Sequence, residues 1–83
     1  MSELSSLPNV GKVLEKNLIA AGITTVSELR EIGTKEAFIR IRAIDSGACV
    51  QMLYGLHGAV IGVNDKELPK QMKEELKQFF KSL

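Results

Sequence analysis

The segment from residue 7 to residue 29 constrains the fold of this chain more than any other stretch. It runs LPNVGKVLEKNLIAAGITTVSEL and combines a tight turn, an apolar helical pattern, a glycine stop and a second helix start. A first helix is expected from Gly11, and its apolar residues recur at helical spacing: Val13, Leu14, Leu18 and Ile19. Gly22 follows where a left-handed helix stop is expected. The segment therefore predicts two short helices with a tight connection.

Capping signals place the second and third helices. Thr25 is followed three residues later by Glu28, which is the spacing of a capping box. The short helix that this box starts is expected to stop at Gly33. Thr34 is then a plausible cap for a third helix, which ends at residues 45–47. The residues expected to face inward on these two helices are Val26, Leu29, Ile32, Ala37, Phe38, Ile41 and Ile44.

The fourth segment, residues 49–63, reads CVQMLYGLHGAVIGV and contains no acidic residue, lysine or arginine. A helix that is apolar on all sides is expected to be buried, either in the domain centre or at a subunit interface. Gly55, Gly58 and Gly62 each cost up to about 1 kcal/mol of helix propensity relative to alanine. That cost suggests close approach by a neighbouring helix. A β-strand is the competing assignment for residues 59–63, but the length of the segment favours helix.

The last helix is expected to open at Leu68 and Pro69, because proline suits the first helical turn. One apolar stripe follows and the lysines fall on the opposite face: the stripe is Leu68, Met72, Leu76, Phe79, Phe80 and Leu83, and the lysines are Lys70, Lys73, Lys77 and Lys81. We predict an all-α fold, a single small domain of about five short helices over residues 1–83.

Charge and composition restrict the function classes. The net charge is +1, from eleven basic and ten acidic residues, which argues against strong autonomous DNA binding. No apolar run approaches the roughly 18 residues of a membrane span. The N-terminal MSELSSLP lacks the features of a secretory signal, and the single Cys49 cannot form an internal disulfide. We therefore expect a cytoplasmic protein with no membrane partner.

Catalytic chemistry has little support in the sequence. His57 is the only histidine and lies in the apolar fourth segment near Tyr54, so a core or interface position is expected. Cys49 has no local basic partner, and a buried, inert thiol is expected. One histidine and one cysteine do not make a tetrahedral zinc site. We predict no catalytic residue, no metal site, no cofactor and no enzymatic activity.

The turn from Leu7 to Gly11 is the strongest candidate site. It resembles the helix-hairpin-helix motif, whose hairpin is typically Leu-Pro-Gly-Val-Gly. The resemblance implies that amides of Val10, Gly11 and Lys12 meet a nucleic-acid phosphate at the helix N-terminus, with Lys16 adding charge. Asn9 replaces the first glycine, and its side chain is expected to crowd an approaching phosphate. The alternative is a helix start that only fixes the packing of the next helix.

A wider resemblance covers nearly the whole chain, from about Leu4 to Phe80. The elements LPNVGKVLEKNLIAAGITTVSELREIGTKEAFIRI, MLYGLHGAVIGV and ELP resemble the C-terminal domain of the TfoX/Sxy proteins, which are associated with the regulation of natural competence in bacteria. The LPNVG turn, with its asparagine, fits this family. Full-length members carry a further N-terminal domain, so the resemblance implies a stand-alone C-terminal module. It implies no enzymatic activity and carries over no settled binding residues.

Two main functions are consistent with these features. The first is a non-enzymatic bacterial regulatory module that contacts a DNA backbone weakly through Val10, Gly11, Lys12 and Lys16, in transcription or DNA-related processes. The second is a protein-interaction or self-association module without nucleic-acid binding, with a protein partner or a homodimer formed through residues 49–63. A remote third, a small enzyme that uses His57 and Tyr54, predicts a pocket around both side chains.

Overall fold

The computed structural model describes residues 3–83, so Met1 and Ser2 of the predicted domain lie outside the described residues. Its elements are η1 (Glu3–Ser6), α1 (Lys12–Ala20), α2 (Val26–Ile32), α3 (Thr34–Ile44), α4 (Val50–Ile61), η2 (Asp65–Glu67) and α5 (Lys70–Lys81). The prediction of an all-α fold with about five short helices is confirmed. The strand alternative for residues 59–63 is wrong, because α4 continues to Ile61.

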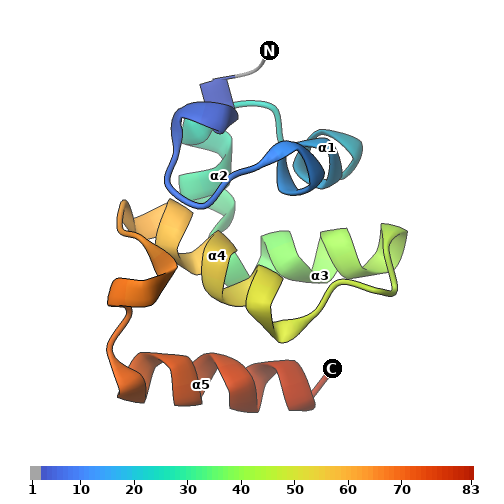
Figure 1. Ribbon diagram of the computed structural model, residues 1–83. Coiled ribbons are helices and arrows are strands. Elements are labelled where there is room, and N and C mark those ends of the chain that lie inside the picture. The colour runs from blue at the N-terminus through green and yellow to red at the C-terminus, as the bar shows by residue number, and fades with distance from the viewer. Residues whose placement is uncertain (1–2) are drawn as a thin grey trace.

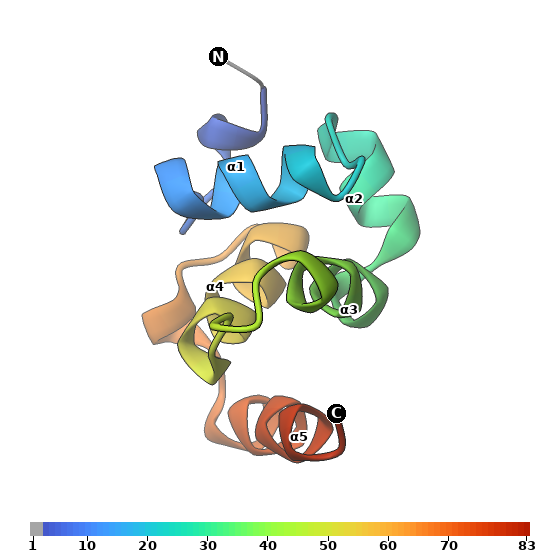
Figure 2. The same cartoon turned by 90° about the vertical axis from the view of Figure 1, so that its right-hand side faces the viewer.

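The helices form three layers (Figures 1 and 2). α3 and α4 lie in the middle, α1 and α2 cover one side of them, and α5 covers the other. η1 and α5 lie at opposite ends of the molecule. No helix within residues 3–83 is long and apolar enough to cross a membrane.

The local signals around α1 and α2 act as predicted. Gly22 has a φ of +85°, and the amide of Ile23 donates to the carbonyl of Leu18 at 2.9 Å, which closes the end of α1. The Thr25 hydroxyl accepts from the amide of Glu28 at 3.1 Å. The Glu28 carboxylate reaches back one residue further than expected, to the amide and hydroxyl of Thr24. Hydrogen bonds from Thr24 and then Thr25 lower the pKa of Glu28.

The predicted cap at Thr34 is wrong. The residue before the helix is Gly33, with a φ of +85°, and Thr34 is already the first residue of α3. Gly33 both ends α2 and precedes α3, so this single residue separates the two helices. The Thr34 hydroxyl is therefore free to reach α4, where it lies 2.8 Å from Nδ1 of His57.

The core draws side chains from every helix and from the connections between them. Its largest fully buried members are Leu4, Leu18, Ile23, Leu29, Phe38, Ile41, Leu53 and Leu56. Three predicted core residues are instead exposed: Val13 at 65%, Ile19 at 44% and Ile44 at 53%.

The inward face of α1 explains why Val13 and Ile19 are exposed. Leu14, Asn17 and Leu18 are its buried residues, and half-buried Ala21 continues their face at helical spacing. Val13 and Ile19 therefore point away from the core. Asn17 is accommodated because its Nδ2 donates to a carboxylate oxygen of Asp45 at 3.3 Å.

α4 is the central helix, and most of its surface is covered, as its apolar sequence predicted. Its buried residues are Leu53, Gly55, Leu56, Gly58 and Ala59, whereas Ile61 is 47% exposed. The close approach inferred from the glycines is real at Gly58. A Cβ atom there would lie 2.5 Å from Nδ2 of Asn9 and 2.6 Å from the carbonyl oxygen of Val63. The approaching group is thus a turn and a loop, and not the neighbouring helix that we expected.

α5 packs through the predicted apolar stripe. Leu76 is buried, and Phe80 stacks at a tilt on Phe38 with ring centroids 6.0 Å apart. Leu83, at the end of the stripe, is exposed instead. Of the four lysines on the opposite face only Lys73 is half-buried, and its Nζ lies 5.8 Å from the centroid of the Tyr54 ring.

Candidate nucleic-acid interface

The turn that precedes α1 is held by its own backbone. The amide of Val10 donates to the carbonyl of Leu7 at 3.4 Å, and the Val10 side chain is buried in the core. Asn9 has a φ of +68°, the left-handed conformation that asparagine tolerates better than most residues. Gly11 is extended and exposed, and it directly precedes the helix.

The side chain of Asn9 points into the domain. Its Nδ2 donates to the carbonyls of Gly55 at 3.2 Å and Val63 at 3.0 Å, and its Oδ1 accepts from the amide of Asp65 at 3.0 Å. We call these three hydrogen bonds the Asn9 clasp. The expectation that Asn9 would crowd a phosphate at the turn is therefore wrong, because its amide group is used against α4 and the loop that follows it.

The N-terminus of α1 is open to solvent. Gly11 supplies no side-chain cap, and the first intrahelical bond runs from the amide of Glu15 to the carbonyl of Gly11 at 3.0 Å. The preceding helix amides have no intrahelical acceptor. Lys12 and Lys16 are exposed one helical turn apart. Gly11, Lys12 and Lys16 thus lie together on the surface, whereas the amide of Val10 is engaged in the turn.

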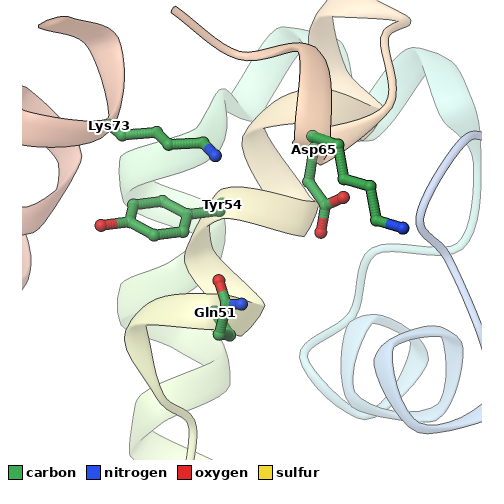
Figure 3. A pocket seen from close by; sticks show the side chains of 5 residues that line it. Gln51, Tyr54, Asp65 and Lys73 are labelled. Carbon is green, nitrogen blue, oxygen red and sulfur yellow. The ribbon is translucent and has the colours of Figure 1, made fainter. Parts of the chain in front are cut away.

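One cavity adjoins this end of α1, and a second lies beyond it towards α5. The first, of about 380 Å³, has an apolar floor of Val13, Leu14, Met52 and Gly55 between α1 and α4, with Gln51 and Asp65 among its polar lining residues. The second, of about 110 Å³, shares Gln51 and Asp65 and adds Tyr54, Lys66 and Lys73. Figure 3 shows the amide of Gln51 and the carboxylate of Asp65 facing the same space, with Lys73 beside the Tyr54 ring. Sequence patterns did not indicate these cavities, because their walls come from four separate elements.

His57 lies elsewhere. It is half-buried and lines a cavity of about 590 Å³ with Thr34, Ile39 and Leu76 among its neighbours. Burial lowers the pKa of its imidazole. Tyr54 lines the cavity on the α5 side of Gln51, so no cavity described for residues 3–83 is lined by both side chains.

The position of Cys49 differs from the buried one that we expected from the sequence. It is exposed and not buried, because it stands in extended conformation just before the first turn of α4, outside the packed part of the helix. The apolar sequence around it suggested burial, but the covered face of α4 begins further along the helix.

Comparison with known proteins gives a consistent family result. Residues 1–80 match the TfoX C-terminal domain. The chain is 36% identical to protein Sxy of Escherichia coli over 80 residues, which is 96% of this chain and 38% of that protein. It is also 36% identical to DNA transformation protein TfoX of Haemophilus influenzae over 76 residues, 92% of this chain and 35% of that protein. The chain therefore spans well under half the length of these relatives.

Two crystal structures from Listeria monocytogenes are similar over nearly the whole chain. One, an uncharacterized protein in a triclinic form, is 53% identical with a TM-score of 0.92, covering 95% of this chain and 90% of that one. The other, a protein of unknown function in a tetragonal form, is 52% identical with a TM-score of 0.93, covering 96% and 98%. The family resemblance indicated by the sequence is confirmed.

Proposed function

The chain belongs to the TfoX C-terminal domain family, and we propose that it is a non-enzymatic bacterial regulatory module that contacts a nucleic-acid backbone weakly. Its relative from Haemophilus influenzae is named a DNA transformation protein, which supports a role in DNA-related processes. The proposed contact is the N-terminus of α1.

The open, uncapped end of α1 is the observation that carries the proposal. Amides at a helix N-terminus bind phosphate oxygens, and the helix dipole favours the negative charge. A Cβ atom at Gly11 would meet nothing within 4 Å, so a ligand has room to approach the backbone there. The Asn9 clasp removes the one side chain that would have stood in the way.

The contact is proposed to be weak because few cations surround it. Lys12 and Lys16 are the exposed lysines of α1, and the net charge of the chain is only +1. Each neutralised phosphate contributes about 0.7–0.9 to the slope of log K against log salt. Two lysine contacts therefore predict a slope of about −1.5.

The test is fluorescence anisotropy with labelled oligonucleotides at low and moderate salt. We expect Lys12→Glu/Lys16→Glu to weaken binding by at least about tenfold at low salt, because two phosphate contacts become repulsive. The matched control is Lys77→Glu/Lys81→Glu, which reverses two exposed lysines at the same spacing on α5. Absence of binding at low salt, or equal losses in the two double variants, would refute the proposal.

A second candidate is self-association through residues 49–63. Ile61 favours it, because this large apolar side chain of α4 is 47% exposed. Most of the remaining α4 surface is covered by the domain itself, so such a contact would be small. Sedimentation velocity at high concentration decides the matter, and a strict monomer would remove this candidate.

A further inference from the structure

The cavity beside α1 and the cavity towards α5 adjoin one another at shared lining residues. They share two lining residues, Gln51 and Asp65, whose side chains Figure 3 shows at the second cavity. We call the pair the α1–α5 track, because it runs from Lys12 at one end to Lys73 at the other. Lysines thus stand at both ends, and Lys66 also lines the second cavity.

The middle of the track is suited to a flat, polar-edged group and not to a phosphate. Val13, Leu14, Met52 and Gly55 give the first cavity an apolar floor. The Asp65 carboxylate would repel a phosphate but can accept hydrogen bonds from the amino group of a base. The Gln51 amide both donates and accepts, as the edge of a base requires. Asp65 is held in place by the Asn9 clasp, through its own amide.

The second cavity adds an aromatic ring and cations. Tyr54 is half-buried, and the Nζ of Lys73 lies 5.8 Å from its ring centroid. A basic surface along which phosphates run, combined with apolar and aromatic surfaces for bases, is the usual construction of a site for single strands. Paired and stacked bases of a duplex cannot enter such a cavity unless they are flipped out.

We propose that the α1–α5 track binds a short single-stranded nucleic acid, with one unstacked base in the apolar cavity, a neighbouring base against the Tyr54 ring, and phosphates near Lys12, Lys66 and Lys73. This inference rests on the proposed contact at the N-terminus of α1 and names its substrate class. The base edge faces Gln51 and Asp65.

The experiment compares two labelled DNA probes of mixed sequence, about 12 nucleotides long, which lies within the range of known single-strand sites. One probe is single-stranded and the other is the matched duplex. At equal low salt we expect the single strand to bind about tenfold more tightly, the size of effect expected for one stacked base. Tyr54 is the only tyrosine and there is no tryptophan, so its emission reports on the track directly. The single strand is expected to quench that emission, and the duplex is not.

Gln51→Glu is the variant that tests the track itself. Gln51 is exposed in the first turn of α4, where an added carboxylate favours the helix. The variant should fold and yet lose the roughly tenfold preference for the single strand. Gln78→Glu is the matched control, because Gln78 is exposed on α5 and lines neither cavity.

Each outcome decides a different point. Equal binding of the two probes, or equal effects of Gln51→Glu and Gln78→Glu, would overturn the track and leave the backbone contact standing. Absence of binding by both probes would overturn the proposed function as well. A preference for the single strand that Gln51→Glu abolishes, together with tyrosine quenching, supports the track.

Discussion

At the scale of single residues, Asn9 combines a backbone role and a side-chain role. Its positive φ lets the turn close before α1, as glycine would in the general helix-hairpin-helix motif. Its side-chain amide also makes three hydrogen bonds, to Gly55, Val63 and Asp65. The backbone role could be predicted, because asparagine tolerates the left-handed region. The side-chain role could not, because the partners lie 46 to 56 residues further along the chain.

Two substitutions separate these roles. Asn9→Gly keeps the positive φ and removes the clasp, so we expect a loss of about 2–3 kcal/mol in the free energy of unfolding, near 1 kcal/mol for each bond. Asn9→Ala adds the cost of a left-handed alanine, about 1–2 kcal/mol more. Urea unfolding of the three proteins measures both steps. A cost below about 0.5 kcal/mol for Asn9→Gly would show that the clasp contributes little to stability.

At the scale of elements, α4 presents two glycines to the turn before α1, and only one of them leaves no room for a side chain. Gly58 lies where any side chain would meet both the Asn9 amide and the Val63 carbonyl, whereas a Cβ atom at Gly55 would be 3.5 Å from the Cβ of Asn9, an ordinary contact. Helix propensity alone treats the two glycines alike. Their difference comes from what packs against each one.

The matched pair Gly55→Ala and Gly58→Ala tests this difference. Both substitutions gain up to about 1 kcal/mol of helix propensity. We expect Gly55→Ala to be neutral or slightly stabilising, because its new methyl group fits. Gly58→Ala is expected to destabilise by about 2 kcal/mol or more, because the clasp and the Val63 carbonyl must move. Thermal unfolding followed by circular dichroism compares them, and equal midpoints for the two variants would contradict the packing described for Gly58.

At the scale of the whole molecule, the middle layer joins the two outer ones. Within that layer the bond between Thr34 and His57 links the first residue of α3 to α4. His57 also lines a further cavity, of about 260 Å³, together with Lys35 of α3 and with Met72 and Glu75 of α5. Protonation of His57 therefore acts at the junction of three helices, and the pH dependence of unfolding reports on the assembled domain.

Burial lowers the pKa of His57 below its ordinary value of 6.5. Just below that pH the unfolded chain binds more protons than the folded chain, so the free energy of unfolding rises with pH across this window. The stability that neutral His57 contributes is fully present above the pKa that this residue has in the unfolded chain. It is lost as the pH falls through the pKa that His57 has in the folded chain. We expect denaturant midpoints to rise with pH in the range just below 6.5, and His57→Gln to remove that rise.

Glu28 also makes the free energy of unfolding depend on pH, and its pH range can be compared with that of His57. Its pKa is lowered by hydrogen bonds from Thr24 and Thr25, so its contribution is present above its ordinary value of 4.5 and lost at more acidic pH. The loss of stability from Glu28 therefore begins below pH 4.5, whereas the loss from His57 begins just below pH 6.5. A rise just below pH 6.5 that survives in His57→Gln would assign that dependence to another group.

By itself, the sequence determined the number and order of the helices and most of their ends, including the stops at Gly22 and Gly33. These signals act within one or two turns of chain, so no distant partner is needed to interpret them. Only the tertiary structure decided that Val13 and Cys49 are exposed, that Thr34 bonds to His57 and not to its own helix, and that Asn9 faces inward. The physical reason is the same in each case: the partner, or the layer that covers the residue, comes from another part of the chain. The α1–α5 track is of this kind, because its walls come from α1, α4, η2 and α5, which are far apart in the sequence.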